Sequence, residues 1–149
     1  MNKKILLVGG GGHCKSVLDS ILLINDYSEI GIVDKAENIG TKVCNIPIIG
    51  CDNDLPRLYE DGYKHAFLTL GSIGNPIRRI ELFTMLEKIG FIIPNILDPS
   101  AVISKFVSME KGIYVGKNAV INNGASLERC TIINTSVTIE HDCIIKGFA

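Results

Sequence analysis

Residues 97–149 carry an apolar side chain at every sixth position. The nine first positions of these hexads are all aliphatic or Met: Leu97, Ile103, Met109, Val115, Ile121, Leu127, Ile133, Ile139 and Ile145. Because about half of the residues of an ordinary protein are apolar, nine matches in nine have a chance probability of about two in a thousand. The fifth positions are also small or apolar, and none is charged: Ala101, Val107, Ile113, Ala119, Ala125, Thr131, Val137, Cys143 and Ala149.

A period of six fits neither a helix, whose period is 3.6, nor a strand that faces one core, whose period is 2. It predicts a parallel β-helix of triangular cross-section, in which three hexads form one coil and residues 97–149 form about three coils. The first residue of each hexad points inward, and the fifth is small because the interior is crowded near the corner. A flat sheet with poor alternation is the alternative, but it would not keep an apolar residue at every sixth position over residues 97–149. The corners accept Gly and Asn, which occur there or nearby at Gly112, Asn118, Asn123, Gly124 and Gly147.

The first half of the chain alternates strand and helix signals instead. A loop is expected over 35–45, and Asp54 is expected to cap a short helix over 55–61. Asn75 and Pro76 predict a helix start by a cap and a first-turn proline, and Gly90 predicts its end. The other expected elements are strands at Lys4–Val8, Ile30–Val33, Pro47–Ile49, Ala66–Leu70 and Phe91–Ile93 and a helix over 13–24. This order predicts a parallel sheet covered by helices, and hence two domains, 1–95 and 96–149.

Composition excludes several classes of function. The net charge of −1 gives no electrostatic footprint for nucleic acid, and no apolar stretch is long enough for a signal peptide or a membrane span. Three scattered histidines predict no metal site. Five cysteines without a CxxC pair predict reduced thiols in a cytoplasmic protein.

Four segments in order, GGGGH, VDK, TLGS and INTSVTIEHDC, carry a family resemblance. With the hexads, the chain resembles the sialic-acid O-acetyltransferases and the UDP-amino-sugar N-acetyltransferases of the bacillosamine and perosamine type. The resemblance implies a Rossmann-like N-terminal domain that binds a nucleotide sugar, followed by a left-handed β-helix that trimerises and binds acetyl-CoA. The implied reaction is acetyl transfer to an amino or hydroxyl group of a UDP-sugar or a sialic-acid-type substrate.

The Glu-His-Asp segment at 140–142 is the candidate catalytic centre. His141 is the third residue of its hexad and is expected to face outward, and an imidazole with a pKa near 6.5 suits a general base. The resemblance assigns the base to His141 and the acid that supports it to Asp142. Neighbours on a regular strand point to opposite faces, so Asp142 orients His141 only if the backbone bends, and Glu140 is the alternative partner. Without the resemblance, a solvated polar corner is the favoured interpretation.

The glycine run at 9–12 is the candidate phosphate-binding loop, because glycines let backbone N–H groups approach a phosphate at a helix start. The dinucleotide fingerprint is only partial, since Cys14 stands where the third glycine belongs, and an NAD-dependent oxidoreductase is therefore a distant alternative. A tight turn without a ligand is another. Arg78 and Arg79 are expected on a solvated helix face. The resemblance places substrate contacts at Gly11, Gly12, His13, Asp34, Lys35 and Gly71.

Outward apolar residues at sixth positions, Val120, Ile132 and Ile144, favour packing of three β-helices about an axis, and hence a homotrimer. Family members continue with further coils, so the β-helix is expected to be truncated and most of the acetyl-CoA site to lie beyond residue 149. A nucleotide-sugar-binding module without catalytic activity is therefore the alternative function.

Overall fold

The computed structural model describes residues 3–71 and 74–149, so that Ser72 of the TLGS segment lies outside the described residues. The chain divides into two compact units. The first contains residues 1–18 and 25–93, and the second contains residues 19–24 and 94–149.

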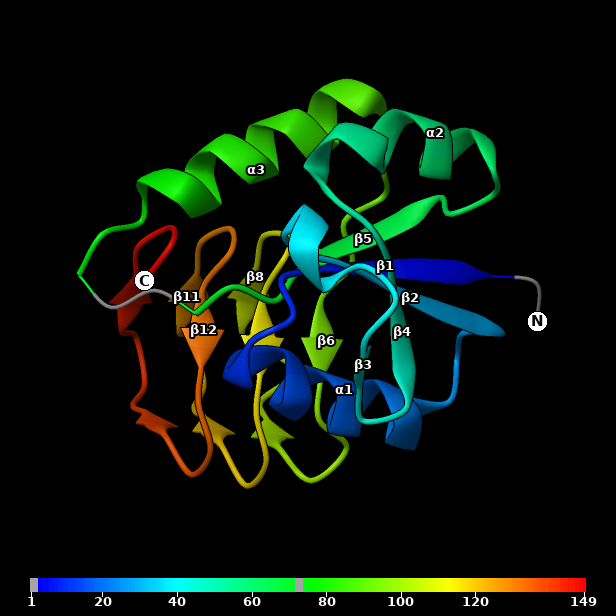
Figure 1. The fold of residues 1–149 in the computed structure, drawn as a ribbon. Coiled ribbons are helices and arrows are strands. Elements are labelled where there is room, and N and C mark those ends of the chain that lie inside the picture. Colours follow the sequence, from blue (N-terminus) through cyan, green and yellow to red (C-terminus); the bar gives the residue numbers. More distant parts are fainter. Residues whose placement is uncertain (1–2, 72–73) are drawn as a thin grey trace. The chain divides into compact units, whose positions relative to one another are not determined.

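The first unit is built on a five-stranded sheet with the strand order β3-β4-β2-β1-β5 (Figure 1). All neighbouring strands are parallel except β3 and β4. Strand β1, which lies between β2 and β5, is buried from Ile5 to Val8, as its apolar sequence there predicts. The strands are β1 (Lys4–Val8), β2 (Glu29–Val33), β3 (Lys42–Val43), β4 (Ile46–Gly50) and β5 (His65–Leu68), and the helices are α1 (Gly12–Ile24), α2 (Leu55–Glu60) and α3 (Ile77–Ile89).

Two predictions of local structure were wrong in this unit. The expected loop over 35–45 contains a short 3-10 turn, Ala36–Asn38, and strand β3, which forms a hairpin with β4. The connecting residues Cys44 and Asn45 both have positive φ, 48° and 68°, as a tight two-residue hairpin turn requires. The expected strand Phe91–Ile93 contributes only one isolated bridge, between Ile92 and His65.

Helix boundaries agree with the predictions better than the capping contacts do. The Asp54 carboxylate accepts a hydrogen bond from the Cys51 backbone N–H at 2.9 Å, so it caps the 3-10 turn Asp52–Asp54 and makes no side-chain cap on α2. Before α3, the Asn75 side chain accepts from the Ile77 N–H at 3.0 Å, while Pro76 is the N-cap and not the first helical residue. Gly90 ends α3 with φ 110°, as predicted.

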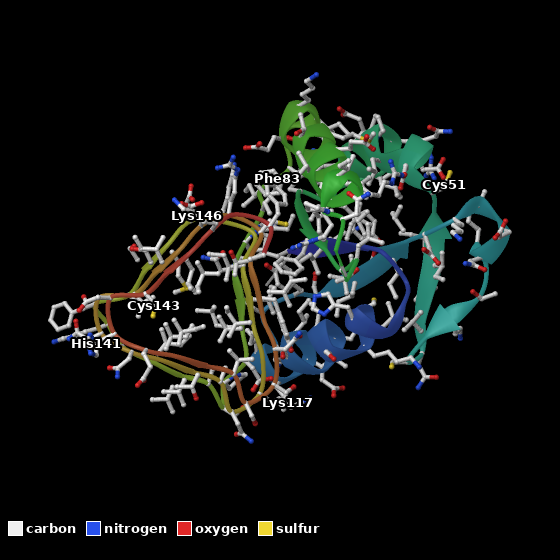
Figure 2. All side chains as sticks on the ribbon, turned by 90° about the vertical axis from the view of Figure 1, so that its left-hand side faces the viewer. Cys51, Phe83, Lys117, His141, Cys143 and Lys146 are labelled. Atoms are coloured by element: carbon white, nitrogen blue, oxygen red, sulfur yellow. The ribbon has the colours of Figure 1, made fainter. Side chains whose placement is uncertain are left out.

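The second unit contains a parallel β-helix that is triangular when seen along its axis (Figure 2). Nine two-residue strands form three stacks, in which each residue pairs with the residue 18 positions away, for example Val102 with Val120 and Val120 with Thr138. The stacks are β6 (Ile96–Leu97), β9 (Tyr114–Val115) and β12 (Ile132–Ile133); β7 (Val102–Ile103), β10 (Val120–Ile121) and β13 (Thr138–Ile139); and β8 (Ser108–Met109), β11 (Ser126–Leu127) and β14 (Ile144–Ile145).

The core of the β-helix confirms the six-residue frame. All nine first positions belong to one hydrophobic cluster, together with the fifth positions from Ala101 to Ala125 and Val137. Thr131 is fully buried, and its hydroxyl donates to the Glu128 carbonyl at 2.7 Å. Cys143 and Ala149, in the last coil, are exposed.

The corners of the β-helix fall at the third and fourth positions of each hexad. From residue 112 onward, the residue at the fourth position of each hexad has a positive φ between 57° and 81°: Gly112, Asn118, Gly124, Cys130, Ser136, Asp142 and Phe148. A single left-handed residue turns the chain sharply, so that one hexad ends and the next begins on another side of the triangle.

The outward sixth positions differ between the stacks. Val102, Val120 and Ile144 are 65%, 38% and 63% exposed. Ile132 is instead partly buried, in the stack whose members Ile96 and Tyr114 are both 2% exposed, so it does not belong to an open apolar face as expected. Among the described residues, no helix is both long and apolar enough to cross a membrane.

Candidate functional site

His141 lies at one corner of the β-helix (Figure 2), and Asp142 is the next residue of the last coil. His141 Nδ1 is 2.9 Å from Asp142 Oδ2, and both side chains are largely exposed. Asp142 has a φ of 60°, and this bend lets its carboxylate reach the side chain of its neighbour. The backbone therefore bends at Asp142, as the contact between two neighbouring residues requires, and Asp142 is the residue that contacts His141.

The carboxylate changes the protonation of the imidazole. The hydrogen bond to Asp142, and next the negative charge of Asp142, raise the pKa of His141 above its ordinary value, with a smaller contribution from Glu140. A carboxylate only accepts hydrogen bonds, so Nδ1 carries the proton of the neutral ring and Nε2 has the lone pair. This arrangement provides a base at Nε2 that faces solvent.

A cavity of about 510 Å³ lies in the first unit, at the carboxyl ends of the parallel strands. Ligands of open parallel sheets bind at this edge, because the loops that follow the strands meet there. Its lining contains cationic and anionic side chains as well as apolar ones: Val8, Gly9, Val33, Asp34, Lys35, Ala36, Cys51, Asp52, Asn53, Leu70, Arg78 and Leu82.

The four glycines serve two different purposes. Gly9 has a φ of 125°, and a Cβ there would lie 2.9 Å from the Leu70 backbone nitrogen. A Cβ at Gly10 would lie 3.0 Å from Asp34 Oδ2, which also accepts a hydrogen bond from Asn38 Nδ2 at 2.9 Å. Gly11 and Gly12 have nothing within 4 Å of such an atom. The first pair therefore satisfies packing, and the second pair leaves open space where α1 begins.

The predicted substrate residues do not all reach the cavity. Asp34 and Lys35 line it, whereas Gly11, Gly12, His13 and Gly71 are not part of its lining. A Cβ at Gly71 would lie 3.8 Å from the Cβ of His13, so these two residues are adjacent. Burial, and next the positive charge of Arg79, lower the pKa of His13 to about 4, so its ring is neutral at pH 7.

Arg78 and Asp52 are cavity residues that the sequence analysis missed. The Arg78 guanidinium pairs with the Asp52 carboxylate and lies 3.6 Å from Glu81 Oε2. Arg79 is only 2% exposed, so the prediction of a solvated pair was wrong for this residue. The position of Arg78 in the loop-and-helix segment that follows β5 was a usable signal, since that segment begins at the carboxyl edge of the sheet.

A Rossmann-like unit followed by a hexapeptide-repeat β-helix defines the class of protein. Residues 4–86 match the model of the PglD N-terminal domain, and the chain belongs to this family. The family resemblance and the fold class, a Rossmann-like domain followed by a left-handed parallel β-helix, are thereby confirmed.

The similarity to several solved structures covers nearly the whole chain. PerB from Caulobacter crescentus, in complex with CoA and GDP-perosamine, is 32% identical, with a TM-score of 0.88 over 98% of this chain and 67% of that one. The same enzyme has been solved with a histidine replaced by asparagine (32% identity, TM-score 0.86, 95% and 64% covered). The acetyltransferase domain of PglB from Neisseria gonorrhoeae is 27% identical, with a TM-score of 0.88 over 99% and 69% of the two chains. The chain thus spans about two thirds of the length of these proteins.

Proposed function

We propose that this chain acts in the transfer of an acetyl group from acetyl-CoA to an amino group of a nucleotide-activated sugar, with His141 as the general base. Similarity to PerB, which binds CoA and GDP-perosamine, and to the PglB acetyltransferase domain supports the reaction class. The observation that carries the choice of base is the 2.9 Å contact between His141 Nδ1 and Asp142 Oδ2 at an exposed corner.

The chemistry follows from the orientation of the imidazole. Asp142 holds the proton at Nδ1, so the Nε2 of His141 accepts a proton from the attacking amine. The amine nitrogen forms a bond to the thioester carbonyl carbon, the C–S bond breaks, and the imidazolium returns its proton to the departing thiolate. The carboxylate stabilises the imidazolium that forms between these steps, because the contact strengthens when the ring is charged.

We assign the nucleotide part of the substrate to the cavity of the first unit. The Asp34 carboxylate would accept from a base N–H or a ribose hydroxyl, and Lys35 and Arg78 would supply positive charge. The open space above Gly11 and Gly12 at the start of α1 suits a phosphate, since helix N–H groups point there. Substrate contacts at His13 and Gly71 belong to the same proposal, with His13 acting as a neutral hydrogen-bonding group.

The test is acetyl transfer to GDP-perosamine and to UDP-amino sugars, measured by mass spectrometry of the sugar product because the five cysteines would interfere with thiol reagents. His141→Ala and His141→Asn should lower kcat by about 10²–10⁴-fold, the usual contribution of a general base. His65→Asn is the matched control, since His65 lies in the first unit and opens strand β5. Unchanged turnover in both His141 variants would refute the role of this residue.

A nucleotide-sugar-binding module without catalysis is the second candidate. It is favoured by one observation: every residue that lines the cavity lies between Val8 and Leu82, within the first unit. Calorimetry with GDP, UDP and acetyl-CoA separates the two functions. Nucleotide binding without acetyl-CoA binding, together with absent turnover, would favour the module.

We also propose a homotrimer, for which the exposure of Val102, Val120 and Ile144 is the supporting observation. Analytical ultracentrifugation measures this directly, and a monomer at micromolar concentration would contradict it.

A further inference from the structure

Gly124 occupies the same corner as Asp142, one coil earlier in the β-helix. The two residues are 18 positions apart, both stand at the fourth position of a hexad, and both have positive φ, 81° and 60°. The Asp142 backbone N–H donates to the carbonyl of Asn123 at 3.2 Å, which ties the two corners together.

The Asp142 carboxylate fills the space that a side chain at position 124 would need. A Cβ built on Gly124 would overlap Asp142 Oδ1 and would lie 3.3 Å from its Cγ, which is tighter than most side-chain contacts. The other carboxylate oxygen, Oδ2, is the atom that contacts His141 Nδ1. One oxygen thus rests over Gly124 while its partner holds the imidazole.

The backbone at this corner favours glycine, since φ is 81° at Gly124 and 75° at Gly112. Equivalent corners nevertheless hold Asn118, Cys130 and Ser136 with φ values of 57° to 59°, so glycine is not required by the turn itself. What distinguishes position 124 is the carboxylate that lies against it.

We propose that Gly124 is a positioning residue, whose missing side chain lets the Asp142 carboxylate lie against the preceding coil and contact His141. The sequence analysis assigned Gly124 only to the geometry of the corner. The inference rests on the proposed function for its catalytic meaning, but the contact itself is measured without substrate.

The charged groups that act on His141 are Asp142 first and Glu140 second. In Gly124→Ala, the new methyl group pushes the carboxylate aside, because a terminal carboxylate rotates more easily than the backbone moves. The hydrogen bond to Nδ1 is then lost, and the pKa of His141 falls toward its ordinary value near 6.5. Glu140 is unchanged and keeps its smaller effect.

The experiment is an NMR titration of the histidine ring protons in the full chain. The chain has only three histidines, and burial lowers the pKa values of His13 and His65, so these two serve as internal controls. Gly112→Ala is the matched variant, because it also adds a Cβ to a glycine at the fourth position of a hexad with a similar φ, 75°, at a different corner of the β-helix from Asp142. We expect a lower pKa for His141 in Gly124→Ala, and no change in Gly112→Ala or at His13 and His65.

A double-substitution cycle tests the route of the effect. In the Asp142→Ala background the carboxylate is absent, so Gly124→Ala should change the pKa of His141 no further. If Gly124→Ala alone prevents folding, the double variant Gly124→Ala/Asp142→Ala should restore a folded β-helix, because the crowding atom is gone. An unchanged pKa in a folded Gly124→Ala, an equal shift in both backgrounds, or a double variant that stays unfolded would each overturn the proposal. Unchanged acetyl transfer in His141→Ala would refute the proposed function and leave the pKa result standing.

Discussion

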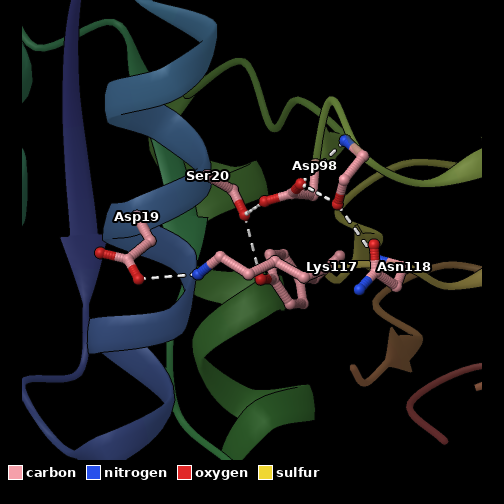
Figure 3. Close-up of polar contacts among 7 residues, drawn as sticks. Asp19, Ser20, Asp98, Lys117 and Asn118 are labelled. Atoms are coloured by element: carbon pink, nitrogen blue, oxygen red, sulfur yellow. Dashed lines mark hydrogen bonds and ion pairs between the residues drawn. The ribbon is translucent and has the colours of Figure 1, made fainter. Parts of the chain in front are cut away.

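A buried polar cluster in the second unit provides the sharpest stability prediction (Figure 3). The Ser20 hydroxyl, near the end of α1, donates to Asp98 Oδ2 at 2.6 Å and lies 3.1 Å from the Tyr114 hydroxyl. Asp98 Oδ1 accepts from both the N–H and the hydroxyl of Ser100, at 2.9 and 2.7 Å. Ser20, Asp98 and Tyr114 are all at most 3% exposed, so water does not replace a lost partner.

Ser20→Ala removes a hydrogen bond to a buried carboxylate and adds no bulk. Hydrogen bonds to charged groups contribute about 1.5–3 kcal/mol, and a buried acceptor that loses its donor has a cost of similar size. We therefore expect the free energy of unfolding to fall by about 2 kcal/mol, or roughly 30-fold in the unfolding equilibrium constant. Ser108→Ala is the matched control, because its hydroxyl bonds to the Ser126 hydroxyl at 3.0 Å at an exposed position, and we expect a change within about 0.5 kcal/mol.

Urea denaturation followed by circular dichroism measures the free energy of unfolding of both variants. Its dependence on pH shows whether the Asp98 carboxylate is the group that loses its hydrogen bond. Burial alone would raise the pKa of Asp98, but hydrogen bonds from Ser20 and Ser100 and the charge of Lys117 hold it below its usual range. A carboxyl with a depressed folded pKa stabilises the fold above its unfolded value, near 3.9, and loses this contribution as the pH falls. The cost of Ser20→Ala should thus be full at pH 7 and shrink below about pH 4. A loss at pH 7 no larger than that of Ser108→Ala would refute this reasoning.

Two further predictions concern the first unit. Gly10→Ala places a methyl group 3.0 Å from Asp34 Oδ2 and should weaken nucleotide binding in calorimetry. Gly147→Ala is the control, because its methyl group lies in the second unit and meets no atom closer than 3.5 Å; equal losses in both variants would contradict the role of the Asp34 side of the cavity. The pKa of His13 is lowered to about 4 in the folded protein, whereas it is near 6.5 in the unfolded chain. The unfolded chain therefore binds a proton more readily, and the free energy of unfolding falls as the pH drops from 6.5 toward 4. His13→Asn should make the melting temperature less dependent on pH between 6.5 and 4, and an unchanged profile would argue against this origin.

The β-helix was predictable because its sequence repeats every six residues over a long segment. Each coil presents the same inward positions, so that Val115, Ile121 and Leu127 could be assigned to the interior without knowledge of any other part of the chain. The parallel sheet was predictable because short apolar runs such as Lys4–Val8 alternate with helical segments. The hairpin at Cys44 and Asn45 was missed because β3 has only two residues, so no alternating strand pattern precedes the turn-forming Asn45.

The sites were only partly predictable. His141 and Asp142 are adjacent in sequence, and the regular repeat places them on the outside, but their contact depends on a φ of 60° at Asp142 that no local pattern specifies. Arg78 reaches the cavity because α3 begins beside the carboxyl edge of the sheet, which is a matter of packing.

The sequence by itself determined the period of six, the inward residues and the identity of the outward imidazole, because repetition and side-chain chemistry are local properties. Tertiary structure decided which groups meet across coils and loops. The Asp142 carboxylate lies against Gly124 only because 18 residues close one coil. Ser20 meets Asp98 only because the end of α1 packs within the second unit. Contacts between distant segments depend on how the backbone closes in space, and no window of the sequence contains that information.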